Sequence, residues 1–312
     1  MTGMTRPAGG AERLMLTVVL LVLGAGWGIT MPLTKIAVST GFGHFGLIFW
    51  QLVIGVVLMS LLLLLRGKGL PRPFQRGPGP WRVWAVIALV GTLVPNTASY
   101  QAAVHLPAGI MAILLSMIPM FAFPVALGMG LDRFSWRRLG GLVAGLTGVL
   151  LIVGPGARIA GDIPVFWVGV ALIAGMCYAM EGNIVAKWGT AGMDPVEVLW
   201  GASLLGAIAV LPLTLLTGQF IPPGALNSTA GHALIGAALA HTGVYAGYVW
   251  LVGRAGAVFA VQVSYLVTGF GVFWAKLILD EAYVGVIWAA LLMMFAGLYL
   301  VQPRPKPALA PA

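Results

Sequence analysis

The chain has 312 residues, of which 60% are hydrophobic and only 8% are charged. Soluble domains carry about 25% charged residues, so this composition excludes an ordinary water-soluble enzyme and predicts an integral membrane protein. The formal net charge of +9 comes from basic residues in short segments between apolar stretches, which argues against nucleic-acid binding.

Ten apolar stretches are each long enough to cross a bilayer. A helix needs roughly 20 mainly apolar residues to cross a hydrocarbon core of about 30 Å. In chain order, the predicted spans are residues 14–36, 46–65, 83–104, 107–129, 137–154, 165–187, 196–216, 232–252, 255–279 and 283–302. No signal-peptidase pattern follows the first stretch, so we expect it to be a membrane helix that is not removed.

Lysine and arginine concentrate on one side of the predicted membrane. Cytoplasmic loops of membrane proteins carry an excess of these residues. With the N-terminus in the cytoplasm, the basic loop 66–82 faces the cytoplasm, and so does every lysine and arginine except Lys35, Arg158 and Lys276. We therefore expect an integral protein of the bacterial inner membrane with both termini in the cytoplasm.

The second half of the chain repeats the pattern of the first, since residues 108–112 resemble residues 255–259. Each half holds five spans, and because five is odd the second half would enter the membrane in the opposite orientation. Inverted repeats are typical of secondary transporters, whose substrate site lies where the halves meet. The sequence predicts an all-α membrane protein with ten transmembrane helices, arranged as two inverted five-helix repeats around a central cavity. The predicted segments are a cytoplasmic N-terminal segment, the two repeats and a cytoplasmic tail, at residues 1–13, 14–154, 165–302 and 303–312.

Four features resemble one superfamily of transporters. Ten spans divide as five plus five, Trp27-Gly28 is followed seven residues later by Lys35 in the first span, Pro119 lies midway along the fourth, and Glu281 stands just before the last. This arrangement is similar to the drug/metabolite transporter superfamily, and within it to EamA-type exporters, most closely the YddG group of aromatic and neutral amino-acid exporters. The resemblance implies that spans one, three, four, six, eight and nine lie nearest the axis, and that export proceeds by alternating access.

The chain departs from that pattern at two places. Many EamA-type chains have an arginine where this one has Gln51, and a glutamate before the fifth span, where this one has Asp132 and Arg133. Neither departure affects the expected fold, but both bear on a substrate assigned by analogy.

Glu181 is the one acidic residue deep within a predicted span. A charge at the centre of a membrane helix costs about 2.5–3.5 kcal/mol on insertion scales, so such a residue usually faces a cavity or a partner. We expect Glu181 to bind a substrate ammonium or to exchange a proton, with Tyr178 one turn before it. The structural alternative is that Glu181 lies near the cytoplasmic end of its span and pairs with Lys187 or simply reaches water.

Three polar-tipped rings share one face of the eighth span, because His241, Tyr245 and Tyr248 fall at i, i+4 and i+7. Such rings could stack on an aromatic substrate while their polar tips orient its charged end. The alternative for Tyr248 is a place in an interfacial aromatic belt. His241 is a second candidate for proton coupling, since imidazole titrates near neutral pH, or a partner in an interhelical hydrogen bond.

Two more spans carry polar stripes. Asn96 and Tyr100, with Gln101 beside them, lie in the third span, and Gln262 and Tyr265 lie in the ninth. Amide and phenol groups can bind the carboxylate and ammonium of a zwitterion. The alternative is interhelical hydrogen bonding, which is worth about 0.6 kcal/mol on average.

The leading interpretation is a monomeric secondary transporter that exports neutral or aromatic amino acids or related metabolites, with Pro119 as a candidate hinge. A multidrug or cation exporter is the second, in which Trp27 and Tyr178 would join Glu181 in an aromatic and carboxylate site. An intramembrane enzyme would need catalytic residues clustered near one interface, which the sequence lacks. No cofactor or metal is expected, because the four histidines are scattered and the glycine pattern at residues 41–46 lies between membrane spans, without a βαβ unit.

Overall fold

A computed structural model describes residues 10–71, 77–154 and 163–302, and within these ranges the chain forms helices and no strand. Most of segment 1–13, the tail 303–312 and the basic residues Arg72, Arg76 and Arg158 lie outside the described residues. The helices of the first half are α1 (Gly10–Gly28), α2 (Thr30–Ser39), α3 (His44–Leu65), α4 (Gly79–Ala88), the π-helical turn η2 (Leu89–Leu93), α5 (Val94–His105), α6 (Ala108–Leu115), α7 (Ile118–Gly128) and α8 (Trp136–Val153). Those of the second half are α9 (Val165–Trp188), α10 (Pro195–Leu216), the short 3-10 helix η3 (Pro223–Asn227), α11 (Thr229–Ala255), α12 (Ala257–Ala260), α13 (Val263–Leu279) and α14 (Gly285–Val301).

Each predicted span coincides with one helix or with consecutive helical pieces. Among the described residues, 8 helical stretches are long and apolar enough to cross a membrane, and two shorter apolar helices, α13 and α14, follow them. The exact count of ten spans and the opposite orientation of the two halves stay predictions.

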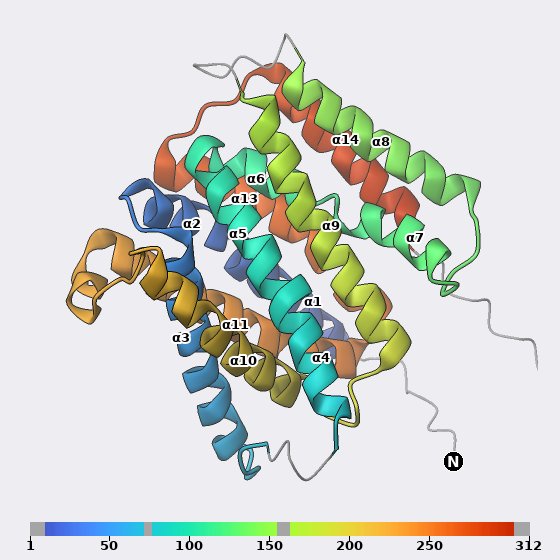
Figure 1. The fold of residues 1–312 in the computed structure, drawn as a ribbon. Helices are drawn as coiled ribbons and strands as arrows, with labels where there is room; N and C mark the ends of the chain where they lie inside the picture. The colour runs from blue at the N-terminus through green and yellow to red at the C-terminus, as the bar shows by residue number, and fades with distance from the viewer. Residues whose placement is uncertain (1–9, 72–76, 155–162, 303–312) are drawn as a thin grey trace, which may run out of the picture.

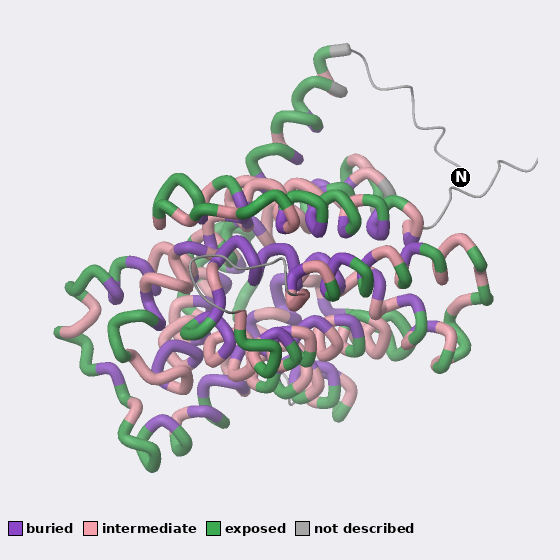
Figure 2. Tube along the Cα trace, turned by 90° about the horizontal axis from the view of Figure 1, so that it is seen from above, coloured by how far each residue is buried: buried purple, intermediate pink, exposed green. Residues whose placement is uncertain are grey.

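Large apolar side chains cover the outside of the bundle. Leu64, Leu150, Phe166 and Leu292 are each 59–71% exposed, and exposed residues follow the outward sides of the peripheral helices (Figure 2). A water-soluble monomer rarely exposes so continuous an apolar surface. The outer surface is therefore suited to lipid.

Two helix pairs flank the bundle. Helices α8 and α14 pack side by side along one edge, and α3 packs against α10 at the opposite edge (Figure 1). Between these pairs, α1 packs against α13, α5 and α7 against α9, and α2 against α11. A β-carbon placed at Gly28 would lie 2.8 Å from the backbone nitrogen of Gly271, so the close approach of α1 to α13 requires a glycine there.

Four of the predicted spans are interrupted, and three of the interruptions come shortly before a proline. Helices α1 and α2 meet at Ile29, the turn η2 precedes Pro95, and α6 and α7 meet just before Pro119. Proline lacks the N–H that closes the preceding helical turn, so the helix breaks or widens there. The fourth interruption, at residues 261–262 between α12 and α13, has no proline and was not predicted.

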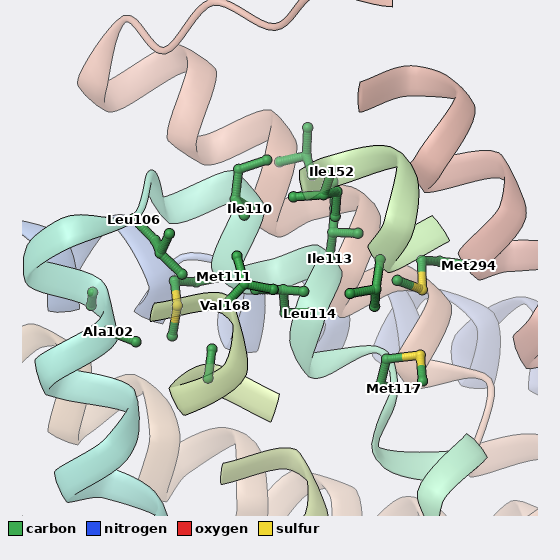
Figure 3. Close-up of a cluster of buried hydrophobic side chains, with 14 of the residues drawn as sticks. Ala102, Leu106, Ile110, Met111, Ile113, Leu114, Met117, Ile152, Val168 and Met294 are labelled. Atoms are coloured by element: carbon green, nitrogen blue, oxygen red, sulfur yellow. The ribbon is translucent and has the colours of Figure 1, made fainter. Parts of the chain in front are cut away.

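Helix α6 lies at the centre of the largest apolar core. Leu106, Ile110, Ile113 and Leu114 are fully buried, and Figure 3 shows them among side chains from several other helices. Because α6 is immobilised on this side, its other face forms a fixed wall of the cavity described next.

Candidate functional site

A cavity of about 610 Å³ lies at the centre of the bundle. Its walls come from α1 and α2, α5, α6 and α7, α9, α11 and α13, which are the six spans that the resemblance implied, with Gln51 added from α3. The lining is mostly apolar and has polar groups at a few positions, which is the usual character of a small-molecule site. Seven of the eleven predicted binding residues line it: Trp27, Asn96, Tyr100, Tyr178, Glu181, His241 and Tyr248.

An aromatic cluster forms one wall of the cavity. The Trp27 ring lies 6.2 Å from the ring of His241 and 5.5 Å from that of Tyr248, in tilted arrangements. His241 and Tyr248 stand two turns apart on α11, while Trp27 lies at the end of α1. Tilted aromatic contacts leave ring faces and edges available to a further aromatic group, so this cluster can hold a flat apolar side chain.

Two pairs of a tyrosine and an amide line the wall formed by α3, α5 and α9. The Tyr178 hydroxyl donates to Asn96 Oδ1 at 2.8 Å, and the Tyr100 hydroxyl donates to Gln51 Oε1. Each amide oxygen is therefore occupied, while neither amide NH₂ group donates to another group in the described part of the chain. These NH₂ groups are neutral donors that can bind a carboxylate.

Glu181 lines the same cavity and has no hydrogen-bond or ion-pair partner among the described residues. The pairing with Lys187 that the sequence left open is not formed, because the Lys187 ammonium donates instead to the backbone oxygen of Met129 at 3.1 Å. Membrane-buried carboxylates without partners are costly. Glu181 is therefore available to a cation or a proton within the cavity.

The opposite end of the cavity is fixed at the break between α5 and α6. The Lys35 ammonium donates to the backbone oxygens of Ala103 and Val104 at 2.7 and 3.0 Å, at the C-terminal end of α5. The Glu281 carboxylate accepts from the N–H groups of Ala108 and Gly109 at 2.6 and 3.1 Å, at the N-terminal end of α6. Each charge complements the dipole of the helix end that it meets.

The two charged side chains of the described lining lie far apart. The Lys35 ammonium donates to the backbone oxygen of Ala103, near the end of α5, whereas the Glu181 side chain lies against Gly91 in η2. The 12 residues between these two positions correspond to roughly 18 Å of helix, whereas Tyr178 and Glu181 are only roughly 4.5 Å apart along the axis of α9. One small zwitterion cannot bridge Lys35 and Glu181, whereas Asn96 is only five residues from Gly91, which places it roughly 7.5 Å along the helix from the level of Glu181.

Comparison with known proteins identifies the family. The sequence profile of the EamA-like transporter family matches this chain twice, over residues 15–154 and 165–302. The chain belongs to the EamA-like transporter family. It is an integral membrane protein and a transporter of small molecules, as members of that family in general are.

The fold of this EamA-like transporter also resembles solved structures. One of them, titled "Crystal structure of protein", has a TM-score of 0.63 at 18% sequence identity, and the match covers 92% of this chain and 98% of that chain. An identity this low shows the fold alone. No curated protein matches the chain at a significant level.

Four of the predicted residues lie outside the cavity of this EamA-like transporter. Gln101 lines a separate hollow that it shares with Leu93, Trp167 and other residues of α5, α9 and α10, because successive residues of a helix point about 100° apart and Tyr100 takes the cavity direction. Tyr245 does not line the cavity, although it lies near enough to Glu181 and Tyr248 for an electrostatic interaction with each.

The other two residues that do not line the cavity belong to the predicted ninth span. Gln262 is exposed at the start of α13, and the Tyr265 ring packs 6.0 Å from that of Phe295 on α14. The cavity side of α13 carries Ser264 and Thr268 instead. Gln262 and Tyr265 share one face of the helix, and Ser264 and Thr268 share another. The sequence therefore indicates two polar faces on this span, and the prediction took the one with the larger side chains.

Polar cavity residues that the binding-site prediction omitted are Thr30, Thr34, Lys35, Gln51, Ser99, Ser116, Ser264 and Thr268. Lys35 and Gln51 had been noted only as points of family resemblance or departure. Within the described ranges, no group of three or more histidine, cysteine, aspartate or glutamate side chains is placed to hold a metal ion.

Proposed function

We propose that this protein is a secondary transporter that exports neutral or aromatic amino acids, or closely related metabolites, by alternating access between inverted repeats in the bacterial inner membrane. The proposal includes a YddG-like specificity, cytoplasmic termini and a monomer as the working unit. The cavity enclosed within one chain supports a monomer, because no second copy is needed to complete its walls.

The spacing of the polar groups carries the assignment to amino acids. An amino acid bears its ammonium and carboxylate on one carbon atom, so its site needs an acceptor and a donor group close together. Glu181 supplies the acceptor, and the free NH₂ of Asn96, held by Tyr178 one turn away on α9, supplies the donor. Neutral amide donors avoid the desolvation cost of a second buried charge.

The aromatic cluster supports an apolar or aromatic side chain on the substrate. Trp27, His241 and Tyr248 line the cavity together. In the proposed complex, the side chain packs against these rings while the charged groups reach α5 and α9. A substrate of this shape uses both the apolar and the polar parts of the lining.

A multidrug or cation exporter is the second candidate, and one observation favours it. Glu181 is a carboxyl group with no cation beside it among the described residues, since Lys35 is bonded to the end of α5. A carboxylate beside aromatic rings is well suited to organic cations through cation–π contacts. Such a substrate needs no donor at Asn96, so the two candidates predict different effects at that residue.

Uptake by proteoliposomes tests the proposal. Labelled phenylalanine, threonine and methionine are offered to liposomes containing the purified protein, with and without an imposed pH gradient. We expect Asn96→Ala to raise the KM for phenylalanine roughly tenfold, while Gln101→Ala, on the same helix but outside the cavity, leaves it unchanged. Uptake of ethidium with no uptake of any of the three amino acids would replace the proposal with a cation exporter.

Proton coupling is tested in the same liposomes. If Glu181 or His241 exchanges a proton during transport, the Glu181→Gln or His241→Gln variant should lose stimulation by the pH gradient while exchange of substrate across the membrane persists. Stimulation that survives in both variants would remove these residues from coupling. Wild-type uptake that ignores the gradient would identify a facilitator. For the hinge proposed at Pro119, the expectation is that Pro119→Ala slows turnover without changing KM.

A further inference from the structure

The third span widens into a π-helical turn beside the cavity. In η2 the N–H of Val94 bonds to the oxygen of Leu89, five residues earlier. Pro95 follows and has no N–H to offer the Gly91 carbonyl at α-helical spacing, which favours the wider turn. Such turns are rare and are frequently found at functional sites.

Gly91, at the middle of this turn, lies directly against Glu181. A β-carbon placed at Gly91 would lie 2.8 Å from Glu181 Cγ, 3.1 Å from its Cδ and 3.5 Å from its Oε1. A separation this short is not tolerated between carbon atoms, so any other residue at position 91 displaces the Glu181 side chain. The side chain of Glu181 therefore occupies the space that the missing β-carbon leaves.

The atom of Glu181 that lies closest to Gly91 determines how the Glu181 side chain must move. Cγ is the second side-chain carbon, and its position is set by χ1 alone. A helical residue has essentially two χ1 rotamers, so moving Cγ away from Gly91 turns the whole carboxylate to another direction. Small adjustments at the end of the side chain cannot relieve the contact.

We propose that Gly91 and its π-helical turn are the positioning device for Glu181: they admit the rotamer that directs the carboxylate into the cavity. The inference rests on the proposed function only in that the carboxylate then meets the ammonium of the substrate. Gly91 itself does not line the cavity and acts through Glu181. The specificity of the site for an ammonium group is thus determined partly by a residue on the facing span.

A double-mutant cycle on thermal stability tests the contact without any substrate. Gly91→Ala is measured in the wild-type background and in the Glu181→Ala background, which lacks Cγ. Alanine in place of glycine normally stabilises a helix slightly, so a clash should reverse that sign. We expect the unfolding midpoint to fall by about 4 °C in the wild-type background and to stay unchanged or rise in the Glu181→Ala background. Gly169→Ala on α9 is the matched control, since nothing lies within 4 Å of its β-carbon position.

Transport kinetics test the positioning role. Gly91→Ala should raise the KM for phenylalanine roughly tenfold with a smaller change in maximal rate, and it should cause no further rise in the Glu181→Ala background, where no Cγ is left to displace. Equal destabilisation by Gly91→Ala in both backgrounds would overturn the inference, and so would a normal KM. Thermal coupling in a protein that takes up no amino acid would leave the positioning of Glu181 intact and reject the proposed function instead.

Discussion

Replacing Glu281 should destabilise the protein more than replacing any charge around it. Its carboxylate accepts hydrogen bonds from the N–H groups of Ala108 and Gly109, and the Tyr283 hydroxyl donates to it as well. A hydrogen bond to a charged group contributes about 1.5–3 kcal/mol, and the carboxylate also complements the positive end of α6 by about 0.3–1 kcal/mol. Because Glu281 is only half-buried, we take the lower values, count only the two backbone hydrogen bonds and the helix dipole, and expect Glu281→Ala to lower the free energy of unfolding by about 3 kcal/mol.

The assay is thermal unfolding of the purified protein in detergent, followed by intrinsic tryptophan fluorescence. A loss of about 3 kcal/mol corresponds to a fall of roughly 6–12 °C in the midpoint for a chain of this size. Asp280→Asn is the matched control, since it removes the neighbouring carboxylate, which is exposed and forms no hydrogen bond with the described residues, and asparagine tolerates its left-handed backbone, with φ 53°. Midpoints for Glu281→Ala and Asp280→Asn that agree within error would refute the reasoning.

Three further predictions concern the ends, packing and lining of the bundle. Partial burial raises the pKa of the Asp194 carboxyl, but the Lys68 ammonium and the N–H groups of α10 outweigh it and hold that pKa below its usual value. Asp194→Asn should cost roughly 0.5–1 kcal/mol near neutral pH. Because a lowered folded-state pKa contributes its full stability above the unfolded value of about 3.9 and loses it as the pH falls through the folded value, the difference from wild type in urea denaturation should shrink progressively below about pH 4. Gly28→Ala should lower the unfolding midpoint by several degrees because its β-carbon meets the backbone of α13, whereas Gly243→Ala, with open space around it, should not; equal midpoints would contradict the close approach. Tyr178→Phe removes the hydroxyl that fixes the α5 amide and should raise the KM for phenylalanine about fivefold with little change in stability, and an unchanged KM would argue against the proposed donor.

Hydropathy and proline positions predict most of this fold, because the bilayer imposes them directly. The predicted first span, residues 14–36, corresponds to the stretch Leu14–Ser39, and the predicted second, 46–65, to His44–Leu65. Pro95 and Pro119 each follow one of the interruptions, at η2 and between α6 and α7. The break at 261–262 escaped because Val261 and Gln262 carry no comparable local signal.

The residues of the cavity were harder to predict than the helices. His241 and Tyr248 are separated by seven residues, which brings them within about 20° of each other around a helix, and both line the cavity. Tyr245 falls by helical spacing between His241 and Ala238, which both line the cavity, yet it does not line the cavity itself. Tyr100 and Gln101, as successive residues, point about 100° apart. Sequence spacing gives the angle between residues but not the rotation of the helix, which depends on packing against neighbours such as α9.

The division of labour between the helices has an evolutionary consequence. The pairs α3–α10 and α8–α14 hold the bundle at its two edges, yet within the described residues they contribute only Gln51 to the cavity. Substitutions on the inner helices can therefore change the cargo without disturbing the pairs that support the bundle. Members of the family can diverge in substrate while keeping the same two outer helix pairs. Within the described residues, position 51 is where a mutation in these pairs would also change the lining of the cavity.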